Sequence, residues 1–201
     1  MRTLRGIGWR ELCWLVLGLV LIVAMRKSLL SYADKLAPVP LPAEFKQRIV
    51  TRDFAVTAEG FSLARRYKTV GGFLKEDEAR VLKTPGVWVA VPVLLEALHE
   101  PTFVRARLRT RDGLEYLSAS DKRPSAPGVN LASGEVVPGL PKNGTFFFEL
   151  PPEALPGAHL EFFSGARQPM LDAVVEIDLG LGKATAADLL AMATEEVDLR
   201  P

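Results

Sequence analysis

The sequence predicts an all-β protein: an immunoglobulin-like β-sandwich with an N-terminal transmembrane helix and a short C-terminal helix. Three observations lead to this prediction. Residues 12–25 are apolar and uncharged, short strand-like segments follow from residue 48 onward, and residues 183–201 return to a helical period. We therefore divide the chain into a cytoplasmic segment with a membrane anchor (1–33), a spacer (34–47), the sandwich (48–182) and a helical tail (183–201).

The apolar run reads LCWLVLGLVLIVAM and lies between Arg10 and the pair Arg26–Lys27. Fourteen helical residues span about 21 Å, which is less than the roughly 30 Å of a bilayer core. A longer helix over Trp9–Leu30 would span it, because basic side chains can extend toward the headgroups. The side chains expected to contact lipid are Leu12, Trp14, Leu15, Leu17, Leu19, Leu21 and Ile22.

Two other interpretations of this run stay open: a cleaved secretory signal ending near Ala33, and a buried core helix. Two cations directly after the run argue against cleavage. The arginines before the run favour a cytoplasmic N-terminus, which places the main domain outside. We therefore expect a single-pass cell-membrane protein with the lipid bilayer as the partner of this helix.

The charge balance excludes one class of partner. The chain has 25 Lys+Arg and 24 Asp+Glu, a formal net charge of +1. Because no basic excess is present, we do not expect a nucleic-acid partner. The sequence also shows no phosphate loop, dinucleotide fingerprint or paired-cysteine motif, so no cofactor is expected.

The elements after the anchor follow a two-residue period. Residues 37–42 read APVPLP, and alternate prolines predict an extended, semi-rigid spacer. Pro92 interrupts the most apolar strand, and because proline lacks an N–H we expect a bend, a bulge or an edge there. The predicted strands are Arg48–Val56, Phe61–Val70, Arg80–Lys83, Val87–Leu98, Phe103–Thr110, Val136–Val137, Thr145–Leu150, His159–Phe163 and Ala173–Gly180.

Asp112–Gly113 is the strongest hairpin signal in the chain. A two-residue turn there pairs Arg109 with Tyr116 and Leu108 with Leu117. This register assigns four side chains to the core: Val104, Ala106, Leu108 and Leu117.

The opposite face of the same strand carries four arginines at alternate positions, and Tyr116 shares this face. Guanidinium groups bind carboxylates and phosphates bidentately, so this face is a candidate contact surface for an envelope protein or an anionic envelope polymer. A solvated face whose arginines pair with glutamates of the neighbouring strand is the open alternative. The candidate contact residues are Arg105, Arg107, Arg109, Arg111 and Tyr116.

Other polar clusters carry less chemistry. His99 lies near Glu96 and Glu100, which favours a solvated strand end over a metal site, and we expect no metal. His159 is interpreted as structural, and residues 60–64 (GFSLA) lack the final glycine of a nucleophile elbow.

Thr185 is predicted to cap a tail helix over Ala186–Val197. We expect this helix to dock on its own domain through its apolar residues, and docking on another protein stays open. These residues are Leu189, Leu190 and Met192.

From about Phe54 to Leu181, the chain resembles the telokin-like, immunoglobulin-type domains of bacterial cell-envelope proteins of unknown function. The resemblance implies a binding, adhesion or assembly module without a shared catalytic set. Pro92 and the helical tail depart from the family pattern. The segments that carry the resemblance are Gly86–Val93, Arg111–Tyr116, Val137–Gly144 and Thr145–Pro152.

Together these observations predict a non-catalytic, membrane-anchored, extracytoplasmic binding or assembly module of the bacterial envelope, as an accessory subunit of a membrane complex. The alternative is an envelope hydrolase or transferase that acts on cell-wall material. Such an enzyme would use loop carboxylates, for example Asp121 or Glu135.

Overall fold

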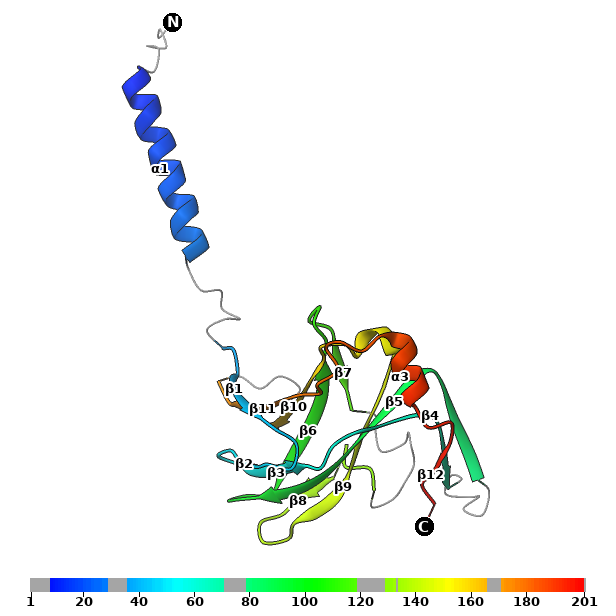
Figure 1. Ribbon diagram of the computed structural model, residues 1–201. Coiled ribbons are helices and arrows are strands. Elements are labelled where there is room, and N and C mark those ends of the chain that lie inside the picture. The colour runs from blue at the N-terminus through cyan, green and yellow to red at the C-terminus, as the bar shows by residue number, and fades with distance from the viewer. Residues whose placement is uncertain are drawn as a thin grey trace, which may run out of the picture. The chain divides into compact units, whose positions relative to one another are not determined.

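The computed structural model describes residues 8–28, 36–70, 79–118, 129–132, 134–165 and 171–200. The chain forms two units, one ending at Ala37 and the other beginning at Pro38. The first unit contains the helix α1, and the second contains the β-strands (Figure 1).

Helix α1 covers Trp9–Ser28, and the large apolar side chains of residues 12–25 are exposed. Glu11 accepts a hydrogen bond from the Gly8 N–H, 3.2 Å away, at the start of the helix. Among the described residues, no helix is long and apolar enough to cross a membrane. This finding goes against the predicted transmembrane span. The 20 residues of α1 include four charged side chains: Arg10, Glu11, Arg26 and Lys27.

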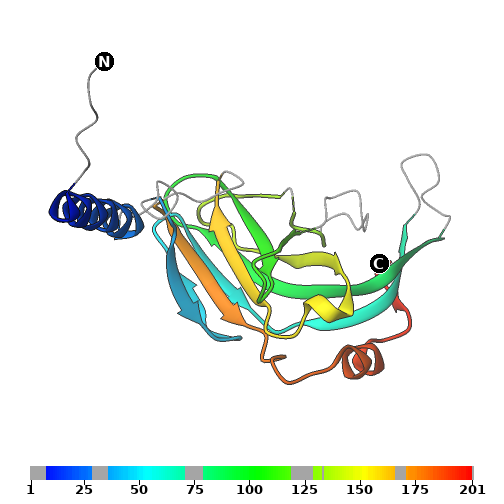
Figure 2. The same ribbon diagram turned by 90° about the horizontal axis from the view of Figure 1, so that it is seen from above.

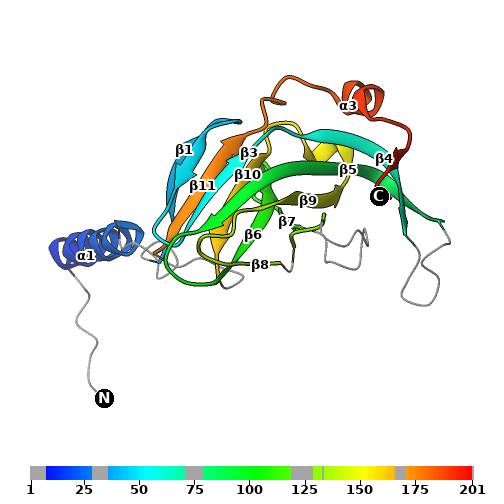
Figure 3. The same cartoon turned by 90° about the horizontal axis from the view of Figure 1, so that it is seen from below.

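The second unit is a β-sandwich of two six-stranded sheets in the described part of the chain, which confirms the predicted sandwich class (Figures 2 and 3). Sheet A has the order β1 (Val39–Ala43), β11 (Ala173–Asp178), β10 (His159–Ser164), β6 (Thr102–Arg109) and β7 (Glu115–Leu117), with β8 (Glu135–Val136) also paired to β6. Sheet B has the order β12 (Val197–Asp198), β4 (Ser62–Val70), β5 (Ala79–Ala97), β3 (Phe54–Ala58) and β2 (Arg48–Val50), with β9 (Lys142–Leu150) on the other side of β5.

The main core lies between the sheets, where alternate side chains of the central strands meet. β5 contributes its odd-numbered residues from Val87 to Ala97, and β6 contributes Val104, Ala106 and Leu108 as predicted. Burial of these side chains is the largest favourable contribution to folding. The largest residues buried in this core are Phe54, Phe146, Phe148, Phe162, Leu95, Leu108, Leu131 and Leu155.

A second apolar cluster lies on the outer face of sheet B. We call it the aromatic bed, because the rings of Tyr67, Trp88 and Phe147 form its centre. The Tyr67 ring lies 5.9 Å from that of Trp88 and 5.3 Å from that of Phe147, in edge-to-face geometry. Burial raises the pKa of the Tyr67 hydroxyl to about 12.

The predicted spacer is in part a strand of the sandwich. Within residues 34–47, Val39–Ala43 form β1, which pairs in parallel with β11 at the edge of sheet A. The Val39 N–H donates to the Asp172 carbonyl at 2.9 Å. The backbone nitrogens of the alternate residues Pro40 and Pro42 therefore face away from β11. Proline suits an outward edge position, because the donor it lacks has no ladder partner there.

Two strand predictions are corrected at their boundaries. The segment predicted as one strand over residues 48–56 is the hairpin β2–β3. The two strands predicted over residues 80–83 and 87–98 are instead the single strand β5, which carries an irregularity opposite Ala64 and Arg66 of β4.

Pro92 lies inside the central strand β5 rather than at an edge. Its carbonyl accepts from the Glu59 N–H at 3.0 Å, so its nitrogen faces the turn between β3 and β4. β3 pairs with β5 up to Ala58–Val93, and β4 begins at Ser62–Ala90. Pro92 therefore lies between the two pairings, where neither β3 nor β4 has a carbonyl that requires a hydrogen bond from its nitrogen.

The predicted tail helix is confirmed at its start and shorter at its end. α3 covers Ala186–Met192, and Thr185 and Asp188 form a capping box. Leu189 is fully buried in the main core, so α3 docks on its own domain as expected, next to the 3-10 helix η1 (Pro152–Ala154). The residues after α3 form β12 instead of continuing the helix.

Gly86 is required by close backbone packing between β5 and β9. A Cβ at this position would overlap the carbonyl oxygen of Leu150. We predict that Gly86→Ala lowers the free energy of unfolding by about 1–3 kcal/mol, the usual cost of overpacking. Urea denaturation measures this change. Gly182→Ala is the matched control, because its Cβ meets nothing within 4 Å; equal stability of the two variants would contradict the prediction.

Candidate functional site

The predicted arginine face is the outer face of sheet A, where β6 lies next to β10. In this register Arg105 is opposite Phe163, Arg107 is opposite Glu161, and Arg109 is opposite His159. The inner-face residues of β6 belong to the core, so these arginines do point away from it.

Arg107 is buried, with 4% of its surface exposed. Its Nε donates to Glu161 Oε2 at 2.5 Å, and its Nη1 lies 2.9 Å from Glu115 Oε1. The guanidinium carbon lies 5.2 Å from the ring centre of Phe163, a cation–π contact. Arg107 is therefore enclosed by residues of its own sheet and is not open to a ligand.

Glu161 is the second buried charge, with 2% of its surface exposed. Its Oε1 accepts from Arg109 Nη1 at 3.3 Å, so one carboxylate joins two arginines. A buried ion pair of this kind is costly to break, because removing one partner leaves an uncompensated charge. Glu161 and Arg107 therefore hold β10 and β6 together on the outer face. No sequence pattern points to Glu161, because the pairing between β6 and β10 cannot be seen from either strand alone.

Three of the four arginines keep accessible donors. The side chain of Arg109 is 53% exposed, and Arg111 is exposed in the loop between β6 and β7. Arg105 is also exposed and donates from Nε to the Gly165 carbonyl at 3.0 Å. The part of the arginine face open to a ligand thus consists of Arg105 and Arg109, and Arg111 is exposed in the adjoining loop.

The predicted hairpin register is wrong by one residue. β7 pairs Leu108 with Tyr116 and Arg109 with Glu115, because the loop spans five residues, 110–114, instead of two. The Thr110 N–H donates to the Leu114 carbonyl at 2.9 Å and closes this wider turn. A shift of one residue exchanges the faces of a strand.

The shift moves two predicted side chains. Tyr116 packs against the core rather than joining the arginines, and Leu117, predicted in the core, is 42% exposed. Glu115 takes the place opposite Arg109 that the predicted register gave to Tyr116, and from there its carboxylate reaches Arg107.

The contacts of His159 and of Glu96, which lies near His99 in the sequence, are ion pairs with different strands. His159 Nδ1 lies 3.3 Å from Glu176 Oε1 on β11, on the same outer face as Arg109. Glu96 pairs with Arg48 at 2.5 Å. In the described part of the chain, no group of three His, Cys, Asp or Glu side chains could hold a metal ion.

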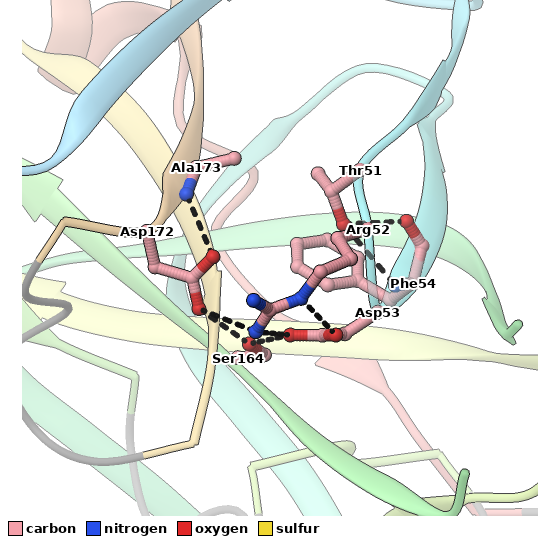
Figure 4. A network of polar contacts seen from close by, with 7 residues as sticks. All are labelled: Thr51, Arg52, Asp53, Phe54, Ser164, Asp172 and Ala173. Atoms are coloured by element: carbon pink, nitrogen blue, oxygen red, sulfur yellow. Dashed lines mark hydrogen bonds and ion pairs between the residues drawn. The ribbon is translucent and has the colours of Figure 1, made fainter. Parts of the chain in front are cut away.

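A polar cluster joins the two sheets at the end of the sandwich where β1 begins (Figure 4). Asp53 follows the β2 strand, and its carboxylate accepts from Arg52 Nε at 2.9 Å and from Ser164 Oγ at 3.1 Å. The Asp172 carboxylate accepts from the Ala173 N–H at 3.0 Å and lies 3.9 Å from Arg52 Nη2. The cluster contains acceptors already paired with donors, so its clearest role is to connect sheet B to sheet A.

This arrangement favours the ionised form of Asp53. The hydrogen bond from Arg52 lowers the pKa of the Asp53 carboxyl below its ordinary value of 3.8. Partial burial opposes this shift, and the Ser164 hydroxyl and the nearby His99 add to it. The hydrogen bond to Asp53, with the charges of Asp53 and Asp172, raises the pKa of Arg52.

The structure describes one of the two carboxylates named for the enzymatic alternative. Asp121 lies outside the described residues. Glu135 is exposed on β8 and pairs with Phe103 in register. An open groove of about 540 Å³ lies elsewhere, lined by Thr84–Gly86, Glu149–Glu153 and Leu190.

The comparisons with known proteins give distant structural likenesses. No family model and no curated protein matches the chain. The chain is similar to an uncharacterised β-sandwich protein from Clostridium difficile 630, with 12% identity and a TM-score of 0.43 over 69% of this chain and 95% of that one. It is also similar to the yjhA protein of Bacillus subtilis, with 14% identity and a TM-score of 0.46 over 67% and 99%. A third similar structure is the secreted protein MPT63 of Mycobacterium tuberculosis, with 10% identity and a TM-score of 0.44 over 69% and 98%.

We predict that Arg107→Met lowers the free energy of unfolding by about 3–5 kcal/mol, because the buried Glu161 carboxylate loses its buried partner. Arg109→Met is the matched control and costs about 0–1 kcal/mol, since Arg109 is half exposed. Combining Arg107→Met with Glu161→Met recovers most of the loss, because no buried charge remains, and the charges left without a partner, Glu115 and Arg109, are exposed to solvent. Urea denaturation of the three variants measures these values. A loss for Arg107→Met no larger than that of the control would contradict the assignment.

The polar cluster predicts a pH dependence. Because the pKa of Asp53 is lower in the folded state, its contribution to stability is present above the ordinary value of 3.8 and is lost as the pH falls below it. Asp53→Asn and Arg52→Gln should each lower stability at pH 7 and flatten the loss in acid. Thermal unfolding at a series of pH values tests this, and an acid profile equal to wild type in both variants would refute it.

Proposed function

We propose that this protein is a non-catalytic binding or assembly module of the bacterial envelope, attached to a membrane through α1, with the sandwich outside the cytoplasm. The telokin-like, immunoglobulin-like classification is part of this proposal. It is supported by the two-sheet sandwich in the second unit and by the sequence resemblance over Phe54–Leu181.

The exposed apolar surface of α1 is the observation that carries the proposal. Leucine, valine and isoleucine side chains of residues 12–25 are exposed without an interruption by charge. A helix that is apolar around its whole circumference is stable only when lipid or protein covers it. Lipid is the cover that also uses the flanking Arg26 and Lys27, which suit anionic headgroups.

The accessible arginines support contact with an anionic envelope partner. Arg109 and Arg111 lie at the β6–β7 loop with free donors, and Arg105 lies on the same face. Guanidinium groups favour phosphate and carboxylate partners. Arg107 has no part in this contact, because Glu161 and Glu115 occupy it.

We predict that Leu17→Glu with Ile22→Glu releases the protein from native membranes into the soluble fraction, because two charges in α1 oppose burial in lipid. Leu17→Ala with Ile22→Ala is the matched control and stays in the membrane pellet after carbonate washing. The mass of the pelleted chain shows whether α1 is retained. Wild-type protein in the soluble fraction with α1 intact would overturn the attachment.

We predict that Arg109→Glu with Arg111→Glu weakens binding to polyphosphate, used as a defined anionic polymer, by about tenfold at low salt. Arg80→Glu with Lys183→Glu makes the same charge change at exposed positions away from the face. Fluorescence titration compares the two variants. Equal weakening would show that net charge, rather than this face, is responsible.

A further inference from the structure

The C-terminal residues Thr194–Leu199 lie along the edge of β4, and we call this segment the tail strap. The Thr194 N–H donates to the Leu63 carbonyl at 2.9 Å, and the Arg65 N–H donates to the Thr194 carbonyl at 2.9 Å. Further along, the Leu199 N–H donates to the Lys68 carbonyl at 2.8 Å. β12 is the part of the strap that pairs in parallel with β4, so the strap extends sheet B by one strand.

The tail strap partly covers the aromatic bed. Val197 and Leu199 pack against it and are only half-buried themselves. Beneath them, Tyr67, Trp88 and Phe147 have 1% or less of their surface exposed. A large aromatic surface is thus covered in part by two aliphatic side chains of a short strand.

The charges of the strap complement those of β4. Glu195 lies 2.7 Å from Arg66 Nη2 and 3.8 Å from Arg65 Nε, and Glu196 lies 3.7 Å from Lys68 Nζ. These side chains are all about a third to two thirds exposed. Exposed ion pairs select a partner by charge but add little stability. The strap is therefore held by its main-chain hydrogen bonds and by Val197 and Leu199, while its acidic residues match it to β4.

We propose that the β4 edge and the aromatic bed form a docking site for an extended partner segment in which acidic and aliphatic residues alternate. The tail strap occupies this site when the partner is absent. Addition of a strand to a sheet edge gives affinity through main-chain hydrogen bonds and specificity through alternate side chains. The order Glu196, Val197, Asp198, Leu199 shows the pattern that the site accepts. This inference deepens the proposed binding role and rests on it, but it does not depend on the attachment of α1.

The test uses the full chain with the strap weakened by Val197→Ser and Leu199→Ser. The probe is a fluorescent peptide of residues 193–200, and binding is measured by anisotropy. A tethered strap competes at an effective concentration of about millimolar, so the variant should bind the peptide at least about tenfold more tightly than wild type. Val50→Ser with Leu140→Ser is the matched control, since both side chains are exposed elsewhere, and it should bind like wild type.

A second peptide with Glu195→Lys and Glu196→Lys should bind about tenfold more weakly, because it repels Arg65, Arg66 and Lys68. A folded variant that binds neither peptide, or both equally, overturns the proposal. A variant that becomes a dimer and ignores the peptide also overturns it, in favour of strap exchange between copies.

If the double variant does not fold, hydrogen exchange of the wild-type protein with excess peptide tests the same proposal. Faster hydrogen exchange at the Leu199 amide supports displacement of the strap, and unchanged exchange overturns the proposal. Neither measurement reports on membrane attachment. A failure of the docking proposal can therefore be told apart from a failure of the proposed attachment through α1.

Discussion

The structure depends on the burial of β5 on both of its faces. Its odd-numbered residues, Val87 to Leu95, lie in the core between the sheets, and Trp88 and Ala90 lie in the aromatic bed. A strand that is apolar on both faces needs cover on both. Sheet A covers one face. The other face is covered by elements distant in sequence, including Val129 and the tail strap.

The two outer faces of the sandwich differ in polarity. The outer face of sheet B is apolar and requires a cover, whereas that of sheet A carries charges that neutralise one another. Arg107 and Glu161 are both buried there, and each has a second partner of opposite charge, Glu115 and Arg109 respectively. The first arrangement places a short strand over an aromatic surface, and the second leaves three exposed arginines at or beside the outer face of sheet A. These are the two surfaces through which we propose that the module binds.

The prolines show how the sandwich accommodates residues that cannot donate. Pro40 and Pro42 lie on the edge strand β1, where they limit pairing with further strands. Pro92 lies in the central strand, opposite the turn that separates β3 from β4. In each case the chain places proline where the ladder has no need of an N–H group.

The sequence by itself determined the strand-rich class, most strand positions, the core face of β6 and the capped start of α3, because these follow from local periodicity and capping chemistry. It did not determine the partners of those strands. The one-residue register of β7 moved Tyr116 into the core and brought Glu115 to Arg107, and pairing with β10 buried Arg107 against Glu161. Only the tertiary structure decided these contacts, because strand register depends on turn geometry and on neighbours distant in sequence, which local patterns do not encode.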